Sequence, residues 1–332
     1  LMLFGLGAVA AVYRMRQRRA WDAMLLACAP IMLFTAVVNW DLFAVATTVF
    51  FLWAWARRKP VLAGILLGIA VGAKFYPLLI AGPLVVLAWR YRRLPVALTS
   101  MAVAGITWLV VNLPFIVFAT DGWLRFFELN SERGIDWGTT WYVLRHISGE
   151  NSTLGTILNN VDVLNLLYLV AFAACCAAIA WVVINAPVPP RLAQVAFLVV
   201  AAFLLTGKVW SQQYVLWLLP LLVLARPQWR AFLAWQAAEL FYFVAFYGEL
   251  LQASNGDENS GVPTWALVSP EWIFVLASTA RLATVVALCV LVLRDIYHPK
   301  LDVVRRSYGF DPDAGPLASD AAVPRSPVLI GR

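Results

Sequence analysis

The chain has 332 residues, of which 62% are hydrophobic and only 13% are charged. A soluble domain of this length needs more polar surface than this composition supplies, so a soluble globular fold is excluded. The net charge of +7 does not indicate nucleic-acid binding, because no basic stripe interleaved with aromatic residues lies outside the apolar runs. The cysteines all lie inside apolar runs, without the spacing of a metal site or a disulfide framework: Cys28, Cys175, Cys176 and Cys289.

Apolar segments separated by short polar breaks follow one another along most of the chain. Several of them approach the roughly 20 residues that carry a helix across a bilayer. We therefore expect an all-α fold, a polytopic transmembrane helical bundle of about 11 segments over residues 1–294. The expected segments are 1–13, 21–38, 41–56, 60–73, 76–89, 95–118, 157–185, 192–206, 213–225, 231–250 and 271–293.

Basic residues sort to one side of this expected bundle. When the connections are assigned alternately to the two faces, 19 of the 25 Lys and Arg residues lie on one side. Cytoplasmic loops are enriched in Lys and Arg, so that side is predicted to be cytoplasmic. The pattern predicts a multi-pass protein of the plasma membrane, with membrane lipid around it and no nucleic-acid partner.

The two ends of the chain differ in character. Leu1 lies inside an apolar stretch that runs from outside to inside, so we expect an N-terminal helix and a first outer loop to precede it. Residues 295–332 are polar, rich in Pro, Asp and Ala, and lack an apolar period, which predicts a disordered cytoplasmic tail. The largest outer loop, about 119–156, mixes acids, bases and aromatic residues, as expected for a surface that handles a polar substrate beside lipid.

Two polar breaks interrupt the hydrophobic pattern near the outer face. The first contains Lys74 and Tyr76, and the second contains Lys208 and Gln212. Backbone that leaves a helix inside a membrane must line a protein or water cavity, because lipid offers no hydrogen bonds. A lysine at such a break provides a compact positive charge for an anionic group such as a phosphate. The alternative is that each lysine extends to the outer headgroups.

Further candidates lie on the outward turns. Asn39 and Asp41 occupy a tight turn, where Asp41 can alternatively cap the following helix. In the large loop, acidic and basic residues are candidates for a base or for contacts to substrate hydroxyls, although a solvated loop also carries such charges freely. These loop residues are Glu128, Glu132, Arg133 and Asp136.

Two charges lie deep in the apolar pattern. Glu239 and Arg281 fall near the middle of their segments, where an isolated charge is unfavourable by several kcal/mol. Their similar depth predicts a structural ion pair between two helices. His146 and His298 lack partners at ligand spacing, so no metal site is predicted, and whether a divalent metal is required stays open.

Four motifs, taken together and in order, resemble those of a known family. They are NWDLFAVATT (39–48), RRKPVLAGILLGIAVGAKFYPLLIAGPL (57–84), FFELNSERGIDWGTTWYVL (126–144) and GKVWSQQYVLWLLPLLVLARPQWR (207–230). In this order they resemble the family 87 glycosyltransferases of actinobacteria. Those proteins are integral-membrane enzymes of the GT-C type, related to polyprenyl-phosphate-mannose-dependent mannosyltransferases.

The resemblance implies transfer of a sugar, expected to be mannose, from a polyprenyl-phosphate carrier to a lipid or glycan acceptor at the outer face. It implies an inverting displacement with a carboxylate as base and no organic cofactor. Lys74 is the first choice for the donor phosphate, Lys208 the second, helped by Tyr76 and Gln212. Asn39, Arg133 and Trp137 are expected to contact substrate.

The resemblance does not assign the catalytic base to one residue of this chain. In enzymes of this type it usually lies in the first outer loop, which we expect ahead of Leu1. Among the residues present, the candidates are Asp41, Glu132 and Asp136, in that order. Two other functions remain open: a transporter or flippase, which also uses broken helices, and a non-catalytic membrane homologue of the enzyme.

Overall fold

A computed structural model describes residues 1–254 and 270–318, which form helices and connections without a strand in these ranges. The first part contains α1 (Met2–Met15), η1 (Gln17–Arg19), α2 (Asp22–Ala27), α3 (Pro30–Thr35), α4 (Asp41–Ala56), α5 (Pro60–Ala73), η2 (Tyr76–Ile80), α6 (Ala81–Arg90) and α7 (Leu94–Phe118). The second contains α8 (Thr120–Glu132), α9 (Thr140–Ser148), α10 (Thr153–Asn159), α11 (Val161–Asn185), α12 (Leu192–Thr206), η3 (Gln212–Tyr214), α13 (Val215–Ala225), α14 (Trp229–Ser254), α15 (Glu271–Tyr297), α16 (Val303–Tyr308) and η4 (Gly315–Leu317). The predicted all-α bundle is confirmed.

Three helices of the described chain are long and apolar enough to cross a membrane: α7, α11 and α15. In the most apolar windows of α7 and α11, only 6% and 11% of the residues are buried inside the protein. Their apolar side chains therefore face outward, as in helices that contact lipid. The other predicted segments correspond mostly to shorter apolar helices, so the structure supports a membrane protein without establishing eleven crossings.

Most predicted helix boundaries lie close to the observed ones, but one segment differs. The ranges 41–56 and 192–206 coincide with α4 and α12. Residues 21–38, expected as one segment, instead form α2 and α3, with Pro30 at the first position of α3. Proline lacks an N–H and disfavours the helical conformation of the preceding residue, and Ala29 is accordingly extended. This break separates the two short helices.

The core lies around α12 and α13, in which nearly every residue is buried. Helix α5 packs closely on α7 through two glycines four residues apart. A Cβ atom on Gly64 would lie 2.4 Å from the carbonyl oxygen of Ser100, and one on Gly68 would lie 2.5 Å from that of Ala104. Small residues at this spacing allow two membrane helices to approach to backbone contact.

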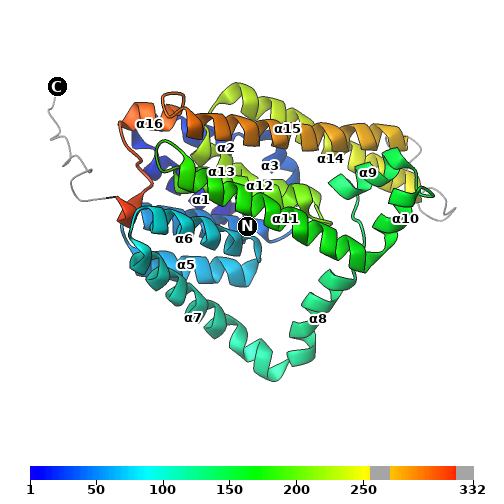
Figure 1. Cartoon of the computed structure of the whole chain (residues 1–332), viewed down its shortest axis with the longest axis horizontal. Helices are drawn as coiled ribbons and strands as arrows, with labels where there is room; N and C mark the ends of the chain where they lie inside the picture. Colours follow the sequence, from blue (N-terminus) through cyan, green and yellow to red (C-terminus); the bar gives the residue numbers. More distant parts are fainter. Residues whose placement is uncertain (255–269, 319–332) are drawn as a thin grey trace.

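The outer loop 119–156 is largely helical. It contains α8, α9 and most of α10, with Thr139 and Ser152 accepting hydrogen bonds as the N-caps of α9 and α10. No residue of α8 is buried, and Figure 1 shows this helix standing apart from the bundle, between the end of α7 and the connection that leads to α9. Several of its apolar side chains are exposed: Leu124, Phe126, Phe127 and Leu129.

The predicted disordered tail is wrong for residues 295–318. Helix α15 continues to Tyr297, and the segment after it packs through two buried acids. Asp313 accepts two hydrogen bonds of 2.6 Å from Arg16, and Asp302 accepts one of 2.8 Å from Arg191. Arg191 also lies 3.4 Å from Asp313. These partners are far apart in sequence, which a local search for an apolar period does not detect. Residues 319–332 lie outside the described ranges.

This C-terminal ion-pair cluster (Arg16, Arg191, Asp302 and Asp313) also completes a helix end. Both arginines donate to the carbonyl oxygen of Leu224 near the end of α13, at 3.0 and 2.7 Å. The last carbonyls of a helix lack partners within the helix, and cations are favoured there. Burial alone would raise the pKa of Asp302, but the charge of Arg191 and the hydrogen bonds to the carboxylate lower it.

We predict that Asp313→Asn destabilises the folded chain by about 3–5 kcal/mol, because it leaves the buried Arg16 without its carboxylate. The change is read as a lower thermal unfolding temperature of the purified protein in detergent. Asp311→Asn is the matched control. Burial and the charge of Asp313 raise the pKa of Asp311 to about 6, so its charge is disfavoured in the folded chain and removing that charge should not destabilise it. Equal destabilisation by the two substitutions would contradict this account of the cluster.

Candidate functional site

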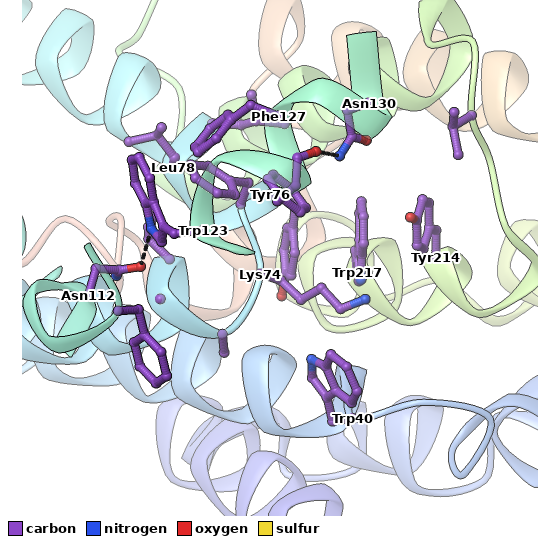
Figure 2. Close-up of a pocket in the computed structure, with 18 of the residues that line it drawn as sticks. Trp40, Lys74, Tyr76, Leu78, Asn112, Trp123, Phe127, Asn130, Tyr214 and Trp217 are labelled. Carbon is purple, nitrogen blue, oxygen red and sulfur yellow. Dashed lines mark hydrogen bonds between the residues drawn. The ribbon is translucent and has the colours of Figure 1, made fainter. Parts of the chain in front are cut away.

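A cavity of about 830 Å³ lies where the first helix break meets α7, α8 and the second break. Figure 2 shows its lining, which is mostly aromatic and apolar, with Lys74 extending into the space beside Trp40, Tyr214 and Trp217. Among the described residues that line it, Lys74 is the single charged side chain. The lining also includes Tyr76, Asn112, Trp123, Phe126, Phe127 and Asn130.

The first break forms as the sequence predicts. Helix α5 ends at Ala73, and Lys74 adopts an extended conformation with φ −153° and ψ 147°. The chain then continues as the 3-10 helix η2, which contains Pro77 and precedes α6. The non-helical residue at the end of α5 therefore lies on a protein cavity, which is where irregular backbone is tolerated in a membrane protein.

Lys74 is held between a carboxylate and two aromatic rings. Its Nζ lies 3.4 Å from Oδ2 of Asp41. It also lies 5.6 Å from the ring centre of Trp40 and 5.8 Å from that of Tyr214. The lysine side chain is 18% exposed, whereas that of Asp41 is completely buried. A partly desolvated ammonium interacts favourably with ring faces at such distances.

Asp41 makes tertiary contacts in place of the local cap that its position allows. It is the first residue of α4, but its side chain forms no capping hydrogen bond. Its Oδ1 accepts a hydrogen bond of 2.7 Å from Nε1 of Trp217, which lies on α13. Negative charge is also favoured at this helix N-terminus. Asp41 lies behind Lys74 and is not among the residues that line the cavity.

Stacked rings form the wall next to Lys74. Tyr76 stacks on Trp217 with ring centres 4.6 Å apart and an angle of 7°, and Trp217 stacks on Tyr214 at 3.8 Å. The Tyr76 hydroxyl donates a hydrogen bond of 3.1 Å to Thr48, deep in α4. Tyr76 is therefore a wall residue that presents its ring, while its hydroxyl is already engaged.

The opposite wall comes from α7 and α8, and sequence analysis missed it. Asn112 accepts a hydrogen bond of 3.2 Å from Trp123 Nε1, as Figure 2 shows. Phe75 stacks on Phe126 with ring centres 5.4 Å apart. A polar side chain inside an apolar membrane segment is a functional signal, so Asn112 was detectable in the sequence. The aromatic residues of α8 had no comparable signal.

The second break is confirmed as a non-helical segment, but neither Lys208 nor Gln212 lines the cavity. Lys208 is 4% exposed, and its Nζ donates to Asn165 Oδ1 at 2.5 Å and to the carbonyl of Ser131 at 3.1 Å. Burial, together with the charge of Arg133, lowers the pKa of Lys208. Gln212 donates to the hydroxyl of Tyr247 at 3.4 Å. These contacts connect α8, α11 and α14 to the break.

The predicted residues of the outer loop do not line this cavity, but two of them lie in a neighbouring hollow that shares Phe126 and Asn130 with it. Glu132 and Arg133 line a smaller hollow of about 490 Å³ along α8. Arg133 pairs with Asp136 at 3.4 Å, and the backbone N–H of Asp136 donates to the carbonyl of Lys208 at 2.9 Å. Trp137 packs on Phe246 and Phe274 in a separate apolar cluster.

Other predicted polar residues have local roles. Asn39 accepts a hydrogen bond of 2.7 Å from the backbone N–H of Trp40 and thereby shapes the turn. Glu128 pairs with Arg125 at 3.2 Å on the exposed surface of α8. Within residues 1–254 and 270–318, no three His, Cys, Asp or Glu side chains gather in a group that could hold a metal ion.

The predicted pair between Glu239 and Arg281 is confirmed at 3.2 Å. The guanidinium of Arg281 lies between the rings of Trp210 and Tyr242, at 4.1 and 4.0 Å from their centres. It also donates weakly to the carbonyls of Trp210 and Ser211 at 3.5 and 3.4 Å. The pair therefore supports the backbone of the second break from α14 and α15.

These features define a membrane-embedded helical protein with a lysine-bearing aromatic cavity at a helix break. The sequence profile of glycosyltransferase family 87 matches residues 1–209, and the chain belongs to this family. Membership identifies it as a membrane glycosyltransferase, as the motifs suggested. All the cavity-lining residues except Tyr214 and Trp217 lie in the matched range. No curated protein and no solved structure matches the chain.

We predict that Trp217→Phe lowers stability by about 1.5–3 kcal/mol, because it removes the N–H donor to a buried carboxylate and keeps the stacked ring. Thermal unfolding in detergent measures the effect. Trp40→Phe makes the same chemical change at a residue that is 61% exposed and is expected to have little effect. A loss for Trp217→Phe no larger than that for Trp40→Phe would show that the indole contact does not stabilise Asp41.

Proposed function

We propose that this chain transfers a sugar, mannose being the expected one, from a polyprenyl-phosphate donor to a lipid or glycan acceptor. The reaction takes place at the outer face of the plasma membrane, opposite the basic connections and the C-terminal segment. The observation that carries the proposal is a single lysine in an aromatic cavity of about 830 Å³, beside lipid-facing helices, in a member of this family. A lipid-linked phosphate needs such a cation near the membrane boundary.

Lys74 supplies this cation. Its ammonium has three donors, and the buried Asp41 behind it fixes its position. The remaining donors point toward the cavity and bind the donor phosphate. As the bond between the anomeric carbon and the phosphate oxygen breaks, negative charge grows on the departing phosphate. A preorganised cation stabilises that charge in the transition state more than in the ground state.

The walls suit a sugar. Aromatic faces pack against the C–H surface of a pyranose, and Trp40, Tyr214 and Trp123 offer such faces around Lys74. The side-chain amides of Asn112 and Asn130 also line the cavity; each donates one N–H to a backbone carbonyl of its own helix and keeps further hydrogen-bonding capacity for sugar hydroxyls. The proposed site therefore binds the phosphate at the helix break and the sugar between the two walls.

The transfer is one inverting displacement. An acceptor hydroxyl oxygen attacks the anomeric carbon, the electron pair of the broken bond passes to the phosphate oxygen, and a carboxylate accepts the hydroxyl proton. None of the described cavity-lining residues is a carboxylate. We assign Asp41 to positioning, because it is buried and already engaged by Lys74 and Trp217. Asp136, partly buried, is then preferred as the base over the exposed Glu132.

A groove supports the lipid part of the donor. An apolar hollow of about 260 Å³ between α5, α6 and α7 shares Val71, Phe75 and Leu78 with the cavity. Several side chains at this rim are exposed, Phe75 at 39% and Leu78 at 50%. A prenyl chain attached to a phosphate at Lys74 can leave the cavity along this groove and enter the bilayer without crossing a polar surface.

Lys74→Met tests the phosphate role, because it keeps the length of the side chain and removes its charge. We expect transfer from a labelled polyprenyl-phosphate sugar to fall by about 100-fold or more in membranes that contain the protein. Lys208→Met is the matched control and should retain most of the activity at equal protein level. Normal turnover by Lys74→Met would contradict the proposal. If the intact donor crosses the membrane of vesicles that contain the protein and no transfer product forms, a transporter would be favoured.

Gly105→Phe tests the groove. A Cβ on Gly105 meets no atom within 4 Å, so a large ring there fills the groove without an internal clash. We expect KM to rise about tenfold for a long-chain donor and to stay unchanged for a short-chain analogue, since the lost contact is that of the prenyl chain. Gly82→Phe adds the same ring at another open position outside the groove. An equal effect on both donors would contradict this path.

A further inference from the structure

A second polar cavity, of about 650 Å³, lies on the side of the bundle that carries α16, opposite α9 and α10 (Figure 1). Its walls are the connection from α4 to α5, the connection from α6 to α7, and the C-terminal segment. The proposed reaction does not use it. The charged and hydroxyl-bearing residues that line it are Arg57, Arg58, Arg93, Arg305, Tyr91 and Asp311.

This basic cavity carries four arginines and one acid. Arg57 and Arg93 are exposed and form no ion pair with a carboxylate of the described residues; the guanidinium of Arg57 lies over the ring of Trp53, 5.8 Å from its centre. Arg305 is partly used, lying 3.7 Å from Asp302 and donating to the carbonyl of Pro189. Arg57 and Arg93 thus bring positive charge to the cavity that no carboxylate of the described residues neutralises.

The two connections share an unusual turn. Two residues after the end of α4 and of α6, the chain adopts the left-handed conformation, at Arg58 with φ 59° and at Arg92 with φ 55°. In each, the next N–H closes a longer hydrogen bond, from Lys59 to the carbonyl of Ala54 and from Arg93 to that of Ala88. Glycine is the usual residue at this position, because a side chain is disfavoured there.

We propose that the basic cavity binds the phosphate of an anionic lipid headgroup. Guanidinium groups bind phosphate through paired, charge-assisted hydrogen bonds. The cavity lies among the basic connections, which face the anionic leaflet when the chain is inserted with its positive side inward. Trp89, 57% exposed at the end of α6, is placed as an interfacial aromatic anchor next to Tyr91. This proposal does not rest on the transfer reaction.

Bound lipid would also hold the C-terminal segment. Residues 310–318 form one wall of the cavity, and Gly315 packs so closely on Trp55 that a Cβ would lie 2.1 Å from the Trp55 carbonyl oxygen. A phosphate bridging Arg305 and the arginines of the two connections joins this segment to α4 and α6. Lipid binding should therefore raise the temperature at which the whole chain unfolds.

The test uses the full chain purified in detergent and measures the shift in unfolding temperature on adding phosphatidylglycerol, phosphatidylcholine or inorganic phosphate. We expect the unfolding temperature to rise with phosphatidylglycerol and to stay unchanged with phosphatidylcholine or inorganic phosphate. Arg57→Gln/Arg93→Gln should weaken that binding at least tenfold. The control Arg92→Gln/Arg306→Gln removes the same charge from exposed residues of the same face that do not line the cavity, and it should bind as the wild type does.

Asp311→Asn provides a second test that does not depend on removing arginines. It keeps the oxygen that accepts a hydrogen bond of 2.9 Å from the backbone of Asp313 and removes the one acid of the cavity, so it should tighten binding. An equal loss in both double variants would show diffuse surface attraction and overturn the site. A shift with inorganic phosphate as large as that with phosphatidylglycerol would overturn the assignment to a lipid headgroup. The absence of any shift in the wild type would overturn the proposal.

Discussion

The contact between Asp41 and Lys74 is the interaction on which the candidate site depends. Both groups lie in an apolar surrounding, where either charge alone would be strongly disfavoured. The pair forms because α4 begins and α5 ends at the same depth, so that a helix N-terminus and a helix break meet. Asp41 is completely buried, whereas Lys74 keeps part of its surface on the cavity. Asp41 thus fixes the position of the Lys74 ammonium, which can still contact a ligand in the cavity.

The rest of the structure keeps this contact in place. Trp217 connects Asp41 to α13 and stacks on Tyr76, while Tyr76 bonds Thr48 within α4. The close packing of α5 on α7 through Gly64 and Gly68 brings the opposite wall within reach. At the second break, Arg281 supports the backbone from α15, and Lys208 ties it to the outer loop. The first break therefore carries the Lys74 ammonium of the candidate site, and the second break connects the helices around it.

Local patterns predicted the parts of the structure that local physics determines. The break at Lys74, the bounds of α4 and α12, and the pair between Glu239 and Arg281 follow from hydropathy, proline position and the unfavourable energy of a lone charge in lipid. The two lysines looked alike in the sequence, but only the position of Asn165 and Ser131 shows that Lys208 is already bonded. The ordered segment before residue 319 was missed because its acids pair with Arg16 and Arg191, far away in the chain. The aromatic residues of α8 reach the cavity through tertiary packing, which the hydrophobic periodicity of the sequence does not reveal.

The central claim is that Lys74, positioned by Asp41, binds the phosphate of the lipid donor. The most direct test is a ³¹P NMR titration of polyprenyl phosphate, the leaving product, with the purified protein in detergent. The account predicts a shifted resonance for the bound phosphate in the wild type, its loss in Lys74→Met, and weaker binding in Asp41→Asn, whose lysine is no longer held. A bound resonance in Lys74→Met at the same position and with the same affinity as in the wild type would contradict the account.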